Sequence, residues 1–259
     1  MMQPLAVFFG FTDGFTFAML ITAAMLGGLV RGFTGFGFAM VFVPIATMAV
    51  GPVAAAALIW LIDIPFAWAL AARRFGHVTW REVFPLLIGA MICVPLGVWL
   101  LTHSDPVMAR WAVAIAIVCG VTALASGWRY RGMPGTLLSL GVGGMAGVAS
   151  GLAQLGGMPI AIFWLAAQNN DPRQTRDNLN GFFSVLPVVS GFFFWWAGML
   201  TWTSLWQALP LCVPYGLGLL LGSVMFPIAS EQTFRRLAYA VIALAALLAM
   251  PIIDPLLGR

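Results

Sequence analysis

One glycine-rich stretch occurs in each half of the chain. Residues 27–37 read GGLVRGFTGFG, and residues 143–154 read GGMAGVASGLAQ. Each lies in a long apolar run, where so much glycine weakens a helix. A break at membrane depth leaves backbone N–H and C=O groups that lipid cannot satisfy, so it persists only where protein or a water-filled cavity covers it. Paired breaks of this kind indicate a binding site in membrane proteins built from repeats.

The composition predicts a polytopic membrane protein without a soluble domain. Hydrophobic residues make up 62% of the 259 residues and charged residues 8%, and apolar runs recur along the whole chain. The net charge of +4 comes from arginines at the ends of these runs, and the chain contains no lysine. Arginines so placed anchor helices at headgroups, so we expect a lipid bilayer and no nucleic acid as partner.

The sequence has none of the patterns of a cofactor site, a metal site or an enzyme. Cys93, Cys119 and Cys212 are isolated within apolar runs, while His77 and His103 fall in predicted loops. We therefore expect structural cysteines, no metal and no haem. No phosphate-binding glycine loop and no Ser/His/Asp arrangement is present, which argues against catalysis.

The order of apolar segments repeats, which predicts an all-α membrane protein made of two repeats, residues 1–131 and 132–259. Matching landmarks support the duplication, since Pro65 corresponds to Pro187 and Gly97 to Gly222. The predicted segments are 12–30, 38–50, 53–72, 83–101 and 107–127, then 136–150, 157–168, 178–198, 204–226 and 232–252.

Arginines in alternate loops predict the orientation of the chain. The positive-inside rule places these loops in the cytoplasm, with only Arg110 and Arg259 on the opposite side. Both termini are then periplasmic, and the two repeats are inverted relative to each other. The arginines assigned to the cytoplasmic side are Arg73, Arg74, Arg81, Arg129, Arg131, Arg173, Arg176, Arg235 and Arg236.

The second segment of each half is short. A helix rises about 1.5 Å per residue, so residues 157–168 cover roughly 18 Å of a hydrocarbon core about 30 Å thick. We expect the first two segments of each half to form a hairpin or a pair of short helices with the glycine-rich tip near the bilayer centre. The sequence leaves open whether these helices are re-entrant or fully spanning.

The two breaks supply the candidate substrate site. Helices that begin after them direct N–H groups and positive dipole ends at the centre, which favours an anion. Thr34 and Ser150 each precede a glycine at positions that we take as equivalent, and their hydroxyls can donate hydrogen bonds. Alternatively, the glycines serve helix packing and the hydroxyls cap helices. The candidate binding residues are Arg31, Gly32, Thr34, Gly35, Ser150, Gly151, Gln154 and Asn178.

Two charged residues lie within apolar segments. An uncompensated guanidinium at mid-membrane costs about 2.5–3.5 kcal/mol, so Arg31 needs a bound anion, lipid headgroups or Asp63 as its partner. Asp63 lies in the run LIWLIDIP at 58–65, where Pro65 weakens the helix. Two roles remain open for Asp63, a proton-coupling carboxylate or a static ion-pair partner.

These residues resemble the TauE/SafE sulfite exporter family over residues 14–252. The resemblance is carried by GFTGFG at 32–37 with Pro44, by Ser150-Gly151, by GGMP at 156–159, and by the duplication. Where the family has a glycine run, this chain has Phe38-Ala39-Met40, which implies a tighter or different site. The resemblance implies secondary transport of small sulfur-containing anions, such as sulfite or organosulfonates, across a bacterial inner membrane.

The leading hypothesis is a secondary carrier for a small sulfur or organic oxyanion. One half would rock against the other around a central site, and Asp63 is the candidate for coupling to protons. An anion channel of the same fold is one alternative. The other is a membrane assembly factor or enzyme that transports nothing.

Overall fold

The computed structural model describes residues 2–72, 75–125, 135–166, 172–225 and 242. Throughout these residues the regular elements are helices, as predicted, and seven are long and apolar enough to cross a membrane. Residues 232–252, except Ile242, lie outside the described part, as do the arginines at 73, 74, 129, 131, 235 and 236. The helices are α1 (Met2–Phe8), α2 (Gly14–Thr34), α3 (Phe38–Val50), α4 (Pro52–Ala72), η1 (Phe75–His77), α5 (Trp80–His103), α6 (Pro106–Ala125), α7 (Thr136–Ala153), α8 (Gly157–Ala166), α9 (Pro172–Trp196) and α10 (Trp202–Met225).

Both glycine-rich stretches break a helix at the predicted place. In the first, α2 gives way to α3 through Gly35 and Gly37, whose φ angles of 83° and 98° lie in the left-handed region that glycine adopts without strain. In the second, α7 gives way to α8 through Gln154, whose φ is 55°. Gln154 is the one non-glycine residue with positive φ in the described part of the chain. With ten residues, α8 is too short to span a bilayer.

The glycines of α2 and α10 bring two helix backbones into contact. A Cβ atom on Gly32 would overlap the carbonyl oxygen of Leu219, and one on Gly222 would overlap that of Leu29. Only glycine permits so close an approach. Helix α2 of the first half is therefore packed along α10 of the second half.

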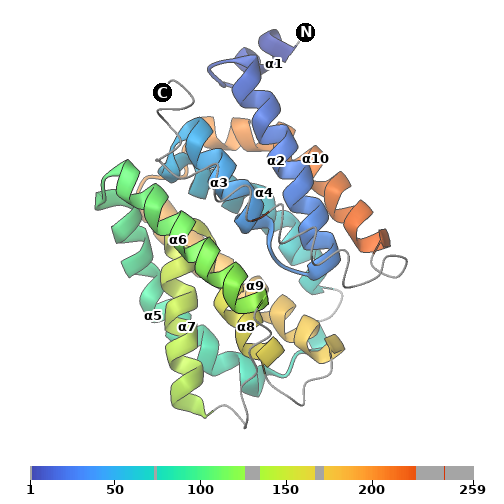
Figure 1. The fold of residues 1–259 in the computed structure, drawn as a ribbon, viewed down its shortest axis with the longest axis vertical. Helices are drawn as coiled ribbons and strands as arrows, with labels where there is room; N and C mark the ends of the chain where they lie inside the picture. Colours follow the sequence, from blue (N-terminus) through green and yellow to red (C-terminus); the bar gives the residue numbers. More distant parts are fainter. Residues whose placement is uncertain (1, 73–74, 126–134, 167–171, 226–241, 243–259) are drawn as a thin grey trace.

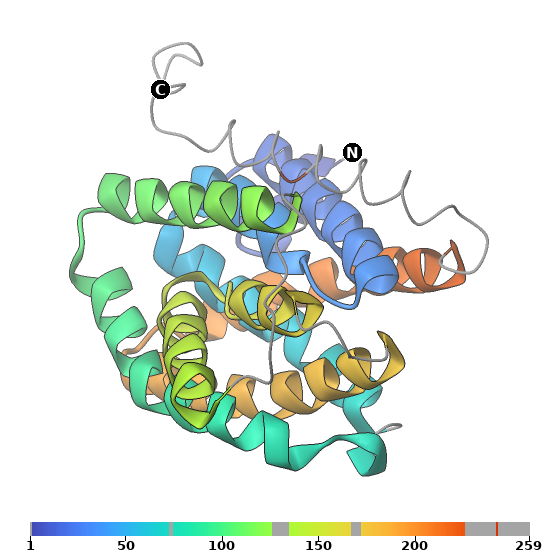
Figure 2. The same ribbon diagram turned by 60° about the horizontal axis from the view of Figure 1, so that its bottom comes forward.

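The same packing recurs between α7 and α5. A Cβ atom on Gly151 would overlap the carbonyl oxygen of Val94, and one on Gly97 would overlap that of Val148. Adding one constant to the residue numbers of α2 gives the corresponding residues of α7, so that Gly32 corresponds to Gly151. A second constant relates α5 to α10, so that Gly97 corresponds to Gly222. Each glycine-rich helix thus packs on a partner from the other half of the chain, so the halves are interleaved (Figures 1 and 2).

Two hydrophobic clusters follow this division. One is built around α2, α3 and α10 and includes Phe42 and Leu211. The other is built around α5, α8 and α9 and includes Leu86 and Phe182. Helix α4 contributes to both and crosses α9, where the indole of Trp60 donates a 2.8 Å hydrogen bond to the carbonyl oxygen of Pro187. Helix α4 therefore links the two clusters, and its contact with α9 belongs to the second.

Candidate functional site

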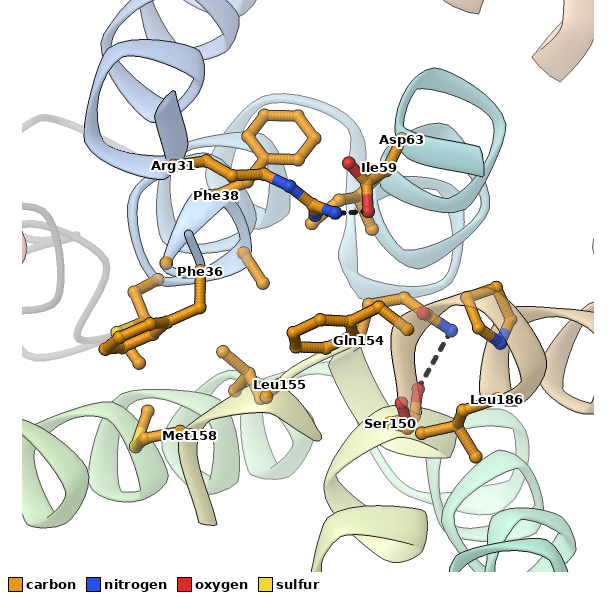
Figure 3. A pocket seen from close by; sticks show the side chains of 16 residues that line it. Arg31, Phe36, Phe38, Ile59, Asp63, Ser150, Gln154, Leu155, Met158 and Leu186 are labelled. Carbon is orange, nitrogen blue, oxygen red and sulfur yellow. Dashed lines mark hydrogen bonds and ion pairs between the residues drawn. The ribbon is translucent and has the colours of Figure 1, made fainter. Parts of the chain in front are cut away.

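A cavity of about 40 Å³ lies between the two helix breaks (Figure 3). Its lining comes from the first turn of α3, from Ile59 and Asp63 of α4, from Ser150 and Gln154 at the end of α7, and from α8 and α9. A water needs about 10–15 Å³ on such a measure, so the cavity suits a few waters or a small oxyanion. Both breaks contribute to one cavity, whose mostly apolar lining carries the polar side chains of Arg31, Asp63, Ser150 and Gln154.

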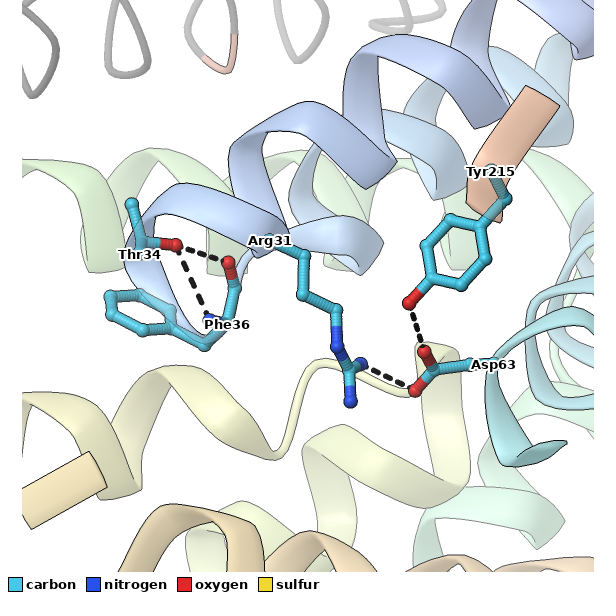
Figure 4. A network of polar contacts seen from close by, with 5 residues as sticks. All are labelled: Arg31, Thr34, Phe36, Asp63 and Tyr215. Atoms are coloured by element: carbon cyan, nitrogen blue, oxygen red, sulfur yellow. Dashed lines mark hydrogen bonds and ion pairs between the residues drawn. The ribbon is translucent and has the colours of Figure 1, made fainter. Parts of the chain in front are cut away.

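Arg31 reaches this cavity from the last turn of α2 and forms an ion pair with Asp63. Its Nη1 donates to Oδ2 of Asp63 at 2.5 Å (Figure 4). Its Cζ lies 5.5 Å from the centroid of the Phe183 ring, within cation–π range. Nε is buried and has no hydrogen-bond partner among the described residues. The ion pair therefore occupies one edge of the guanidinium and leaves other N–H groups uncommitted.

Tyr215 completes the polar contacts of Asp63. Its hydroxyl donates to Oδ1, the carboxylate oxygen that Arg31 does not contact (Figure 4). The tyrosine is fully buried in α10, with its ring centroid 4.2 Å from that of Phe38 and 5.0 Å from that of Phe66. Tyr215 is not among the site residues predicted from the sequence. Its signal was a polar aromatic residue in the middle of the apolar segment 204–226.

The second break brings neutral donors to the cavity. Ser150 is buried, and the amide nitrogen of Gln154 donates to the carbonyl oxygen of Ser150 at 3.1 Å. The first turns of α3 and α8 also line the cavity, through residues 37–40, 157 and 158. The opening N–H groups of a helix have no partners within that helix and carry its positive dipole end. Two such ends meet at this site.

Four predicted residues serve the helix breaks and do not line the cavity. The Thr34 hydroxyl shares its single proton between the carbonyl oxygens of Val30 and Phe36 and closes the end of α2. Gly35 makes the turn, and Gly32 and Gly151 occupy the backbone contacts described above. The packing also corrects the expected equivalence of Thr34 and Ser150. Because Gly32 corresponds to Gly151, Ser150 corresponds to Arg31.

Asn178 lies in a different polar cluster. Its amide nitrogen donates to Oε2 of Glu82 at 2.9 Å, and its amide oxygen accepts from the backbone N–H of Thr79 at 2.8 Å and from Gln174 at 3.1 Å. These bonds join the beginning of α9 to the beginning of α5. Asn178 is buried but does not line the cavity of Arg31.

The described residues contain no group of three His, Cys, Asp or Glu side chains that could hold a metal ion. What they place together is an arginine, a carboxylate and a tyrosine beside a cavity at two helix breaks. Helices long and apolar enough to span a membrane surround this polar site, an arrangement typical of membrane proteins that move solutes or ions.

The comparison with family models agrees with this class. The model of the sulfite exporter TauE/SafE family matches residues 20–249, and the chain belongs to this family. It is therefore a protein of a membrane transport family. No curated protein and no solved structure matches the chain significantly.

Proposed function

We propose that the protein is a secondary transporter that moves a small sulfur-containing anion, of the sulfite or organosulfonate type, by alternating access. The observation that carries this proposal is the guanidinium of Arg31, which lies beside a cavity shared by both helix breaks and keeps N–H groups free of partners in the described structure. A planar fork of donors matches the oxygens of a sulfonate, a sulfite or a carboxylate.

The rest of the lining supports an anion. The first turns of α3 and α8 line the cavity with their remaining backbone N–H groups, since those of Met40 and Met158 already donate to the carbonyl oxygens of Gly37 and Leu155, and Ser150 adds a hydroxyl without adding charge. Such donors stabilise negative charge at helix N-termini. The proposal that the substrate contains sulfur rests on the family, whereas the proposal of a small anion rests on the hydrogen-bond donors and the size of the cavity.

The ion pair gives a reason for coupling to protons. Arg31 and Asp63 neutralise each other, so an incoming anion adds an uncompensated negative charge to a buried site. Burying an unpaired charge is costly. A proton on Asp63 restores neutrality and frees Arg31 for the anion. We therefore propose that anion and proton move together, with Asp63 as the coupling carboxylate.

The interleaved halves specify what moves. Helices α2 and α10 share backbone contacts, as do α5 and α7, so neither pair can separate without losing its closest packing. We propose that alternating access moves the group around α2, α3 and α10 against the group around α5, α7 and α8, with the cavity between them. This replaces the expectation that one sequence half rocks against the other.

The proposed transporter is built from two repeats. Equivalent packing of α2 on α10 and of α7 on α5 supports two repeats, residues 1–131 and 132–259. Their inverted orientation, the inner-membrane location and the periplasmic termini follow from the arginine pattern and remain predictions.

Binding is tested first, by thermal shift of the purified protein with sulfite, isethionate, taurine, thiosulfate and simple carboxylates. A ligand that binds the folded state raises its stability as the site fills. Stabilisation by a sulfur oxyanion in the wild type, lost in Arg31→Ala, is the expected result. An equal shift in both proteins would place the anion elsewhere.

Transport is tested by counterflow in proteoliposomes. Unlabelled substrate on one side should accelerate entry of labelled substrate from the other, because a carrier returns faster when loaded. Flux without this acceleration would indicate a channel. A protein that moves none of the anions would contradict the proposal and favour a membrane assembly factor or enzyme.

A further inference from the structure

We propose that Tyr215 is a positioning residue for the anion site, because it prevents Asp63 from occupying the guanidinium of Arg31 at two points. The inference rests on the proposed anion binding by Arg31. It assigns an influence on substrate affinity to a tyrosine that does not itself line the cavity and reaches the site through Asp63.

The geometry of the ion pair is unusual in one respect. Arginine and carboxylate often pair through two parallel hydrogen bonds. Here the pair has one, from Nη1 of Arg31 to Oδ2 of Asp63, and the second carboxylate oxygen accepts from the hydroxyl of Tyr215. Both oxygens of Asp63 are satisfied, yet only one edge of the guanidinium is used.

Tyr215 is held firmly enough to do this. Its ring packs against those of Phe38 and Phe66, and it has no exposed surface. Its backbone lies directly against Gly28, where a Cβ atom would overlap the carbonyl oxygen of Tyr215. The close α2–α10 contact thus fixes the distance at which the hydroxyl reaches Asp63.

Removing the hydroxyl changes which donors Oδ1 can find. Leaving an ionised carboxylate oxygen without a partner in a buried site is costly. Arg31, which already pairs with Oδ2, carries uncommitted N–H groups that could satisfy Oδ1. The carboxylate of a Tyr215→Phe protein is expected to rotate into a two-point contact with Arg31. A substrate anion would then have to displace Asp63 from donors that the wild type leaves open.

The test is a double-mutant cycle in the purified full-length chain with sodium sulfite as the probe. Its proteins are the wild type, Tyr215→Phe, Asp63→Asn, and the double variant. Tyr215→Phe should weaken sulfite binding about tenfold, whereas the same change in the Asp63→Asn background should change it less than about twofold, because an amide cannot form the two-point ion pair. Ser223→Ala is the matched control, since it removes a hydroxyl of α10 that donates to its own helix at the carbonyl oxygen of Leu220.

Three results separate the possibilities. An unchanged affinity in Tyr215→Phe would overturn the inference while leaving the proposed function intact. An equal loss in both backgrounds would also overturn it, because Tyr215 would then act through packing. A wild-type protein that binds no sulfite and none of the other anions would contradict the proposed function and this inference with it. The variants are expected to fold, because phenylalanine keeps the ring contacts and the double variant leaves no carboxylate without a donor. The unfolding midpoint of each protein checks this independently.

Discussion

The two broken helix pairs are packed alike but carry different chemistry. Gly28 and Gly32 of α2 contact the backbones of Tyr215 and Leu219, while the corresponding glycines of α7, at 147 and 151, contact those of Ala90 and Val94. The scaffold is therefore the same at each break. The difference lies in the side chains that the scaffold presents.

Three positions account for that difference. Where the first break has Arg31, the second has Ser150, and where α10 has Tyr215, α5 has Ala90. The proline landmarks match Asp63 of α4 with Val185 of α9. The buried ion pair and its tyrosine thus have neutral counterparts at the second break. Glycine therefore marks the scaffold, whereas the site depends on positions at which the halves differ.

The largest effect is expected at Arg31 and its counterpart Ser150. Arg31→Ala should weaken sulfite binding by about 2–5 kcal/mol, the range for truncating one member of a buried charge pair. Arg31→Lys should restore little of this affinity, because lysine lacks the planar fork of N–H donors. Ser150→Ala should cost about 0.5–1.5 kcal/mol, as for one neutral hydrogen bond. Titration calorimetry measures both. Equal losses would mean that the two breaks contribute alike.

Glycine substitutions test whether the shared scaffold is as rigid as its backbone contacts suggest. Gly32→Ala and Gly151→Ala should each lower the stability of the folded protein by about 3 kcal/mol, at the upper end for overpacking, because backbone atoms must shift. Gly141→Ala is the matched control, since Gly141 is exposed on α7 and a Cβ atom there meets nothing within 4 Å. Unfolding midpoints in detergent give the comparison. A tolerated Gly151→Ala would show that the α5–α7 contact can loosen.

Asp63→Asn removes the negative member of the ion pair and leaves the first break with the positive charge of Arg31, so the two breaks differ more than in the wild type. Without the tethered carboxylate, Arg31 is free for the substrate, so sulfite should bind about tenfold more tightly, or about 1.4 kcal/mol. Counterflow should persist, while uphill movement driven by a pH gradient should be lost. If Asp63 is only a static partner, the variant should instead lose several kcal/mol of stability without gaining affinity. A stable variant that still concentrates sulfite under a proton gradient would exclude both roles.

Much of the fold could be predicted because its causes are local. Apolar run length and glycine content placed the segments 38–50 and 53–72 almost where α3 (Phe38–Val50) and α4 (Pro52–Ala72) lie. The same signals placed both breaks. They also identified two residues, Arg31 and Asp63, whose burial requires a partner, and the structure pairs them with each other.

What the sequence could not provide are contacts between distant parts of the chain. Tyr215 and Asp63 are 152 residues apart, and an apolar pattern does not show which spans are neighbours. The alignment of Thr34 with Ser150 failed for a related reason. Glycines recur at about one-turn intervals in both stretches, so a shift of roughly one turn preserves the pattern, and only the backbone contacts of Gly32 and Gly151 fix the register.

The smallest predicted effect concerns the turn residues, Gly35 at the first break and Gln154 at the second. Gln154 adopts a left-handed conformation that costs a non-glycine residue about 1–2 kcal/mol, and its side chain lines the cavity. Gln154→Gly should therefore raise stability by up to about 1 kcal/mol, since part of the relief is offset by a more flexible unfolded chain. The same change should weaken sulfite binding by about 0.5–1.5 kcal/mol, because one amide donor is lost.

Gln154→Asn is the control, as asparagine tolerates this conformation but carries a shorter amide. Opposite signs for stability and affinity would mean that the strain at this position is kept for binding, whereas unchanged affinity in Gln154→Gly would reduce Gln154 to a cap on the carbonyl oxygen of Ser150.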